Sequence, residues 1–209
     1  MPYDADLGRY RIDVRQETRA KAADMLRRAG CRSKPAPSWG SKKLPAMAVA
    51  VHFRGKSAKH MKDLEHAQAS LIFAAIKAKG RVPILLNSAA GGAGATPLPS
   101  ESVWGGDAET LAAVIGECEA FVGIDSGPGK AASATDTPTL IVWTKHHPLQ
   151  FHDPAPNTTH LVFEHHMGMV PIENNLGVAE YFSKAYKYTT YERGGLVENV
   201  VDWLGGILK

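Results

Sequence analysis

The sequence predicts an α/β protein with a doubly wound, mainly parallel sheet, which is a Rossmann-like fold. Short apolar runs typical of buried strands alternate with amphipathic segments of helical period. Their order is strand, helix, strand, loop, helix, strand, short helix, strand. Because parallel strands need a long crossover between them, usually a helix, this order is typical of α/β domains.

The composition is that of a globular protein, since 44% of the 209 residues are hydrophobic and 22% are charged. No apolar run approaches the roughly 18 residues that a membrane helix needs. Residues 1–10 lack the apolar stretch of a signal peptide, so we expect a cytoplasmic protein. The net charge of +3 is mild and the basic residues are scattered, which argues against a nucleic-acid partner. Cys31 and Cys118 are expected to be reduced and at least half-buried.

The first part of the chain predicts a helix and a connector. Apolar residues recur at helical spacing over 13–29, and Gly30 is suited to end that helix. Residues 31–46 are rich in Pro, Ser and Lys and show no periodicity. We therefore divide the chain into an N-terminal helix and connector, 1–45, and a Rossmann-like domain with C-terminal helices, 46–209.

The next segments predict the first half of the sheet. Residues 47–53 have the β-leaning, apolar composition of a strand buried on both faces. A helix over 62–79 and a strand over 81–88 follow, and Pro83 in that strand indicates a sheet edge or a bulge. Residues 89–106, which include the glycine-rich GGAGA, are predicted to be flexible.

The second half of the sheet begins after a helix for which Asp107 is a good N-cap. The predicted elements that follow are a strand at 121–124, a short helix, a strand at 138–143, a strand at 159–163 and a C-terminal helix at 196–208. Four tyrosines precede that last helix on a segment predicted as a helix followed by a turn. They are interpreted as packing residues with solvated hydroxyl groups, and they are Tyr181, Tyr186, Tyr188 and Tyr191.

The stretch DSGPGK, residues 125–130, begins where the strand 121–124 ends. Open parallel sheets bind their ligands at the carboxyl ends of the strands. Gly127 and Gly129 would let the chain turn sharply and bring backbone close to a ligand, and the amides that open the next helix attract an anion.

The side chains of this stretch suit a sugar phosphate. Ser126 supplies a hydroxyl group and Lys130 a mobile cation for the phosphate. Asp125 would be repelled by a phosphate, so its partner should be a neutral sugar hydroxyl that donates to it. The alternative is that Asp125 only caps the helix and that the glycines only turn the chain.

The segment AETLAAVIGECEAFVGIDSGPGKAASATDTPTLIVW resembles the C-terminal, nucleotide-sugar-binding half of the bacterial heptosyltransferase family. Upstream, VAVHFRGKSAKHMKDLEHAQASLIFAAIKAKGRVPILL is similar to the first strand of that half and to its His-containing loop. The resemblance covers roughly residues 45–165. It implies one half of a GT-B fold and an inverting glycosyltransferase. The donor substrate would be a nucleotide-diphosphate sugar, with no metal or other cofactor.

The resemblance also implies site residues. Asp125, Ser126 and Gly127 would contact the donor sugar and diphosphate, and Lys59 would neutralise phosphate. The chain departs from the family at Lys130, where members usually have His, and in having no room for the N-terminal acceptor domain. We therefore expect an acceptor-domain partner chain or a homodimer. The predicted dimer surface comprises Tyr181, Phe182, Tyr186 and Trp203.

Basic residues follow the strand 47–53 in the loop HFRGKSAKH. His52, Arg54, Lys56 and Lys59 would line the phosphate site from the wall opposite DSGPGK. The alternative is a solvated charged loop, with His52 as a hydrogen-bonded histidine at the end of its strand.

A histidine-rich stretch lies between residues 146 and 166. Its spacing fits none of the usual zinc patterns, and adjacent histidines point in divergent directions, so we do not favour a metal site. Lys145, His146 or His147 would instead border the crevice and contact nucleotide or sugar.

Two functions remain open at the level of sequence. The first is the donor-binding half of a glycosyltransferase, in which Asp125 and Lys59 are the best candidates for assisting transfer and the catalytic base has no candidate. The second is a non-catalytic module that binds a nucleotide or sugar phosphate. A phosphatase or hydrolase is disfavoured, because the sequence has neither a GxSxG elbow nor a paired Asp motif.

Overall fold

The computed structural model describes residues 11–31, 47–55, 62–86, 101–103, 107–164, 184–192 and 194–208. Its helices are α1 (Gln16–Arg28), α3 (His66–Ala78), α4 (Ala108–Gly116), α5 (Gly127–Ser133), α6 (Pro148–Phe151) and α9 (Leu196–Ile207). Its strands are β1 (Ala48–His52), β2 (Val82–Leu86), β3 (Glu101–Val103), β4 (Ala120–Ile124), β5 (Thr139–Trp143), β6 (Thr158–Phe163) and β7 (Lys187–Tyr191). The predicted alternation of strands and helices is confirmed.

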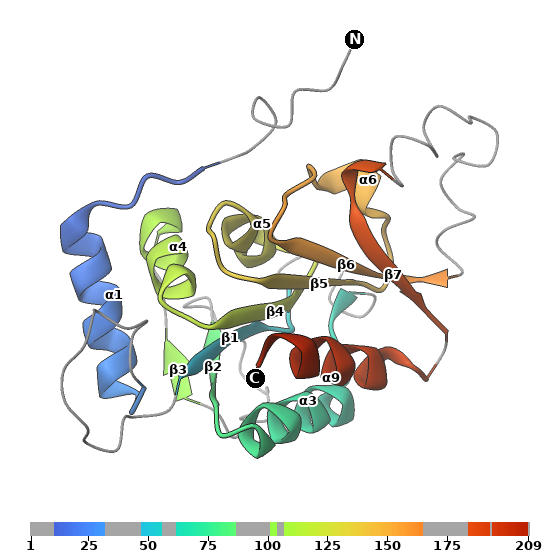
Figure 1. Cartoon of the computed structure of the whole chain (residues 1–209), viewed down its shortest axis with the longest axis horizontal. Coiled ribbons are helices and arrows are strands. Elements are labelled where there is room, and N and C mark those ends of the chain that lie inside the picture. Colours follow the sequence, from blue (N-terminus) through green and yellow to red (C-terminus); the bar gives the residue numbers. More distant parts are fainter. Residues whose placement is uncertain are drawn as a thin grey trace, which may run out of the picture.

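Within the described residues the strands form one sheet of order β3-β2-β1-β4-β5-β6-β7. Every pairing between neighbours is parallel. The chain runs outward from β1 to β3 on one side of the sheet and from β4 to β7 on the other (Figure 1). The doubly wound Rossmann-like fold is therefore confirmed.

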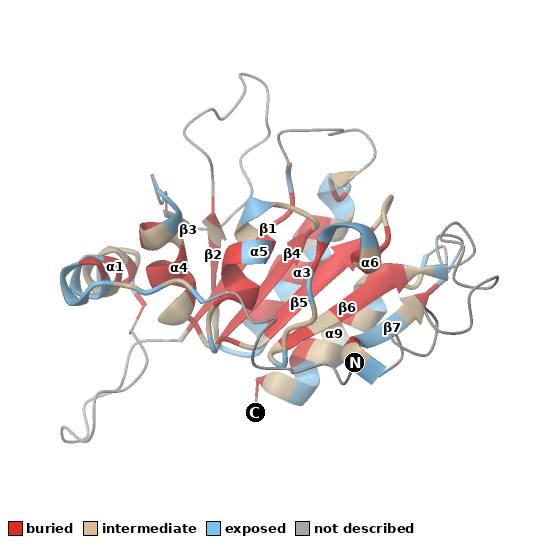
Figure 2. Ribbon diagram, turned by 90° about the horizontal axis from the view of Figure 1, so that it is seen from above, coloured by how far each residue is buried: buried red, intermediate tan, exposed pale blue. Residues whose placement is uncertain are grey.

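Helices cover both faces of this sheet. α3 and α9 lie side by side on one face, and α1, α4 and α5 lie on the other (Figure 1). The core beneath α3 and α9 contains Phe73 and Ile76 of α3. The core beneath α1, α4 and α5 contains Leu26 of α1 and Phe121 of β4. Because both faces are covered, β1, β4 and β5 are buried along their length, which explains their continuous apolar sequences (Figure 2).

Two strands differ from the sequence prediction, and both lie at the edges of the sheet. β3 falls in the segment predicted to be flexible, and β7 replaces the turn predicted among the tyrosines. β7 buries only Tyr191, so its sequence carries no apolar run. The hydroxyl groups of Tyr186 and Tyr191 also differ from prediction, because they donate to the backbone carbonyls of His152 and Trp143.

Two local predictions have structural explanations. The Oδ1 atom of Asp107 accepts a hydrogen bond of 2.7 Å from the backbone N–H of Thr110, so the predicted N-cap of α4 is confirmed. Pro83 lies in β2, which has neighbours on both sides. The described residues of β3 begin opposite Ile84, however, so Pro83 pairs only with Val49 of β1. None of the helices in the described ranges is long and apolar enough to cross a membrane.

A polar clamp fastens α1 to α4. The backbone N–H and guanidinium of Arg15 and the hydroxyl of Thr18 all donate to the Glu109 carboxylate, at 2.8 to 3.1 Å. The hydrogen bonds from Arg15, and then that from Thr18, lower the pKa of Glu109 from 4.5 to about 2. The clamp therefore favours the ionised carboxylate.

We expect the wild-type chain to lose more stability than Glu109→Gln as the pH falls from 5 towards 2. A carboxyl group with a depressed pKa stabilises the folded state fully above its unfolded pKa of about 4.5, and this contribution disappears as the pH falls to about 2. Urea denaturation at several pH values measures the difference. Glu117→Gln, at the other end of α4, is the matched control, and parallel curves for wild type and Glu109→Gln would contradict the prediction.

Candidate functional site

The fold creates a crevice where the strand order reverses. β1 and β4 are neighbours, although β2 and β3 separate them in sequence. The helix α3 that follows β1 and the helix α5 that follows β4 lie on opposite faces (Figure 1). Open α/β sheets bind ligands at such switch points, outside the carboxyl ends of the strands. Asp125 directly follows the last residue of β4, so it lies at this position.

Asp125 is the centre of a nearly buried charged cluster. Its Oδ2 atom lies 2.6 Å from Nζ of Lys62, and the two side chains are only 9% and 14% exposed. Nδ1 of His146 lies 3.4 Å from the same oxygen. Lys62 comes from the connection between β1 and α3, and His146 follows β5, so the fold brings three distant segments together. No described residue donates to Oδ1.

An exposed aromatic ring borders this cluster. Phe151, at the end of α6, is 45% exposed. Its ring centroid lies 5.8 Å from Nζ of Lys62 and 4.7 Å from the ring centroid of His146. The ring supports the ammonium group by a cation–π contact and leaves a flat apolar surface on which a ligand ring can pack.

The other residues of DSGPGK divide between ligand access and packing. No side chain or backbone atom lies within 4 Å of the Cβ position of Gly127, so the backbone is open to a ligand there. At Gly129 a Cβ would meet the carbonyl oxygen of Ile124 at 3.2 Å, which explains this glycine by close packing on the sheet. Neither residue has positive φ, so neither position requires the left-handed conformation that favours glycine. The hydroxyl of Ser126 donates to the Ile124 carbonyl.

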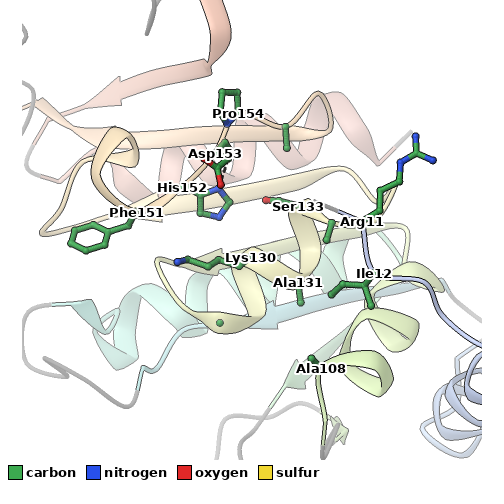
Figure 3. A pocket seen from close by; sticks show the side chains of 13 residues that line it. Arg11, Ile12, Ala108, Lys130, Ala131, Ser133, Phe151, His152, Asp153 and Pro154 are labelled. Atoms are coloured by element: carbon green, nitrogen blue, oxygen red, sulfur yellow. Dashed lines mark hydrogen bonds between the residues drawn. The ribbon is translucent and has the colours of Figure 1, made fainter. Parts of the chain in front are cut away.

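A cavity of about 400 Å³ lies beside the Asp125 cluster, between α5 and the segment 151–155 (Figure 3). Lys130 points from α5 along this cavity towards Phe151, and Arg11 lies at its other end (Figure 3). Asp125 does not line the cavity. Because Phe151 contacts the cluster and also lines the cavity, the two spaces are neighbours that share this side chain.

Most described histidines of the histidine-rich stretch are structural. His147, His152 and His160 are buried, and His147 caps α6 by accepting from the backbone N–H of Leu149. The indole N–H of Trp143 donates to Nδ1 of His160 at 3.0 Å. Burial lowers the pKa of His152 and of His160, so their rings are neutral in the folded chain. The described residues contain no group of three or more His, Cys, Asp or Glu that could hold a metal ion.

The basic loop after β1 is only partly described. The ring of His52 is buried and its Nδ1 lies 2.8 Å from the carbonyl oxygen of Leu86. Burial lowers its pKa, so the neutral ring donates through Nδ1 and only Nε2 could meet a ligand. Arg54 is exposed beyond β1, whereas Lys56 and Lys59 lie outside the described residues. Their phosphate contacts therefore stay predictions, as does that of the half-exposed Lys145.

The sequence analysis missed Lys62 and Phe151. Lys62 lies three residues after Lys59, in the same basic stretch, but nothing in the sequence distinguishes which lysine meets Asp125. Phe151 lies in a helix of four residues, too short to give a periodic signal. Lys62 and Phe151 become apparent only in the tertiary structure, where the β1–α3 and β5–α6 connections meet at the end of β4.

The parallel sheet, its two helical layers and the crevice at the switch point define a Rossmann-like half of the GT-B glycosyltransferase fold. Residues 107–172 match the model of glycosyltransferase family 9 (heptosyltransferase). The family resemblance predicted from DSGPGK and its flanking segments is thereby confirmed. No curated protein sequence matches the chain.

Two solved structures share this fold. The glycosyl transferase family 9 protein from Veillonella parvula DSM 2008 superposes with a TM-score of 0.59 at 15% identity, over 92% of this chain and 54% of that one. The E. coli ADP-heptose LPS heptosyltransferase II gives a TM-score of 0.53 at 13% identity, over 95% of this chain and 53% of that one. The chain thus spans about half the length of the solved structures that it resembles.

Proposed function

We propose that the chain is the donor-binding half of an inverting glycosyltransferase and that it binds a nucleoside-diphosphate sugar. One observation carries the proposal: Asp125 lies nearly buried at the switch point of the sheet, within the segment that matches family 9. One of its oxygens is paired with Lys62, and none of the residues that the structure describes donates to the other. A carboxylate neutralised in this way can accept a sugar hydroxyl without repelling the diphosphate beside it.

The charges around the crevice suit the leaving group of such a transfer. Lys130, the last residue of DSGPGK, lines the neighbouring cavity together with Gly127, whose Cβ position is open. Lys59 of the basic loop after β1 is proposed to join Lys130. In the transfer, an acceptor oxygen attacks the anomeric carbon and the bond between that carbon and the diphosphate oxygen breaks. Fixed cations stabilise the charge that develops on the diphosphate.

The acceptor and the base that takes its proton are proposed to come from a partner chain or a second copy. The chain spans about half the length of each of the two solved structures, which is consistent with this proposal. Of the aromatic residues predicted for a dimer surface, Tyr186 is buried and Trp203 packs partly against the core, whereas Tyr181 and Phe182 lie outside the described residues. A cytoplasmic location remains part of the proposal.

Calorimetric titration with ADP, UDP, GDP and a sugar ester of each tests the proposal. ADP-heptose is included because the name of the E. coli relative contains it. We expect one sugar nucleotide to bind, with an affinity that EDTA leaves unchanged. We expect Lys59→Ala and Asp125→Asn each to weaken binding about tenfold or more, since each removes a charge-assisted hydrogen bond. Lys79→Ala, beyond the end of α3 and away from the crevice, is the control. Binding of no panel member would contradict the proposal.

A second candidate is a non-catalytic module that binds a nucleotide or sugar phosphate. It rests on the same observation of Asp125 and Lys62 at the switch point, which supports binding of a ligand without identifying a catalytic base. The two candidates differ in turnover. Release of the nucleoside diphosphate from the bound sugar nucleotide, in the presence of a partner chain and acceptor, would support the enzyme. Binding without such release under any condition would support the module.

A further inference from the structure

We propose that Lys62 is the positioning residue of this site. It holds one carboxylate oxygen of Asp125, so that the other oxygen can accept a hydrogen bond from a hydroxyl of the ligand's sugar. This inference rests on the proposed function and assigns a role to a residue outside the predicted set. It also predicts that Lys62 acts on the sugar and leaves the diphosphate to other cations.

The geometry of the pair supports an orienting contact. Nζ of Lys62 lies 2.6 Å from Oδ2 of Asp125, a short charge-assisted hydrogen bond. The side chains are 14% and 9% exposed, so water competes little for either charge. His146 approaches the same oxygen at 3.4 Å. Both contacts use Oδ2, and no described residue donates to Oδ1, the second acceptor of the carboxylate.

Lys62 is itself held in place. Its backbone carbonyl accepts a hydrogen bond of 3.2 Å from the hydroxyl of Thr144, which follows β5. The next residue, Asp63, accepts from the backbone N–H of Gly55 at 2.7 Å. The ammonium group lies over the ring of Phe151. A lysine anchored through its backbone, its neighbour and its charge has little freedom to follow a phosphate in solvent, unlike a lysine on an exposed loop.

The charge of the pair explains why this arrangement suits a sugar next to a diphosphate. A lone buried carboxylate would repel the phosphates, and an unpaired carboxylate in a nearly dry site would tend to become protonated. The pair of Lys62 and Asp125 carries no net charge, and Oδ1 of Asp125 is still a strong hydrogen-bond acceptor. A direct phosphate contact by Lys62 would use another of the three ammonium donors, and its loss would weaken binding of the nucleoside diphosphate as well. The two roles therefore predict different losses in a variant.

The test compares a sugar nucleotide with its own nucleoside diphosphate, with ADP-heptose and ADP as the first pair of probes. We expect Lys62→Met to weaken binding of the sugar nucleotide about tenfold to a hundredfold and binding of the nucleoside diphosphate less than about threefold. Lys62→Arg, which keeps the charge and can donate to Oδ2, should restore most of the affinity. In an Asp125→Asn background, Lys62→Met should add little further loss, because its effect passes through Asp125.

Several results would overturn the inference. Equal losses for the two ligands would make Lys62 a phosphate ligand, and unchanged binding by Lys62→Met would remove it from the site. Thermal melts establish that each variant is folded. If the wild-type chain binds no ligand, the proposed function fails. The contact between Lys62 and Asp125 is then tested by the free energies of unfolding of Lys62→Met, Asp125→Asn and the double variant. Additive effects there would show that Lys62 does not hold Asp125, whereas coupling would support the pair.

Discussion

The Asp125→Ala variant is expected to be about 3 to 5 kcal/mol less stable than the wild-type chain, because it leaves the ammonium group of Lys62 nearly buried without its counter-ion. His146 cannot replace the lost carboxylate, since an imidazole carries no negative charge that could pair with the ammonium group. A loss of this size is a large part of the total stability of a typical domain, which is roughly 5 to 15 kcal/mol. The variant is therefore predicted to affect folding as well as ligand binding.

Urea denaturation of three variants measures this effect. Asp125→Ala with Lys62→Met should recover much of the loss, because removing both charges leaves neither one uncompensated. Asp24→Ala is the matched control: its carboxylate pairs with Arg27 and Arg28 on the exposed side of α1, where we expect a cost of about 1 kcal/mol or less. Equal costs at Asp24 and Asp125 would show that the cluster behaves as a surface ion pair.

Trp143→Ala is expected to destabilise the chain by about 4 to 6 kcal/mol. The side chain is fully buried at the end of β5, and removing a buried aromatic side chain costs about 3 to 5 kcal/mol. The substitution also removes the indole N–H that donates to Nδ1 of His160, which leaves a buried acceptor without its partner at a further cost of about 1 kcal/mol or more. The ring of His152 would lose its edge contact with the indole as well.

Urea denaturation of two further variants separates the contribution of the buried side-chain volume from that of the hydrogen bond to His160. Trp143→Phe keeps most of the volume and removes the hydrogen bond, so it should cost clearly less than Trp143→Ala. Trp203→Ala, in the partly buried surface of α9, is the matched control and should cost less than either cavity in the interior. If Trp143→Phe is as destabilising as Trp143→Ala, the hydrogen bond to His160 would be the dominant contribution and our estimate of the cavity would be wrong.

The predictions that the structure confirms depend on burial that continues over several residues. β1, β4 and β5 are buried at every position, so their sequences are continuous apolar runs that can be recognised without the fold. The helices α1 and α3 bury one side, and their sequences have helical period. The cap at Asp107 depends on a contact over three residues, so it was also predictable.

The edges of the sheet were less predictable. Among the described strands, β3 and β7 each have a neighbour on one side only, so they need no continuous apolar sequence. β7 became a strand because β6 offered it a ladder of hydrogen bonds, although its sequence, KYTTY, is mostly exposed. Such a pairing is a property of two segments distant in sequence, and neither segment reveals it alone.

The sequence by itself determined the doubly wound fold and the place of DSGPGK at the end of a buried strand, and its motifs carried the resemblance to the heptosyltransferase family. The fold and that placement depend on short-range patterns in which hydrophobic burial repeats with the period of a strand or helix. The tertiary structure alone decided that Lys62 pairs with Asp125, that Phe151 borders the pair and that Gly129 serves packing. The physical reason is that the ion pair at the site joins residues 63 positions apart, and only closure of the sheet brings them within hydrogen-bonding distance.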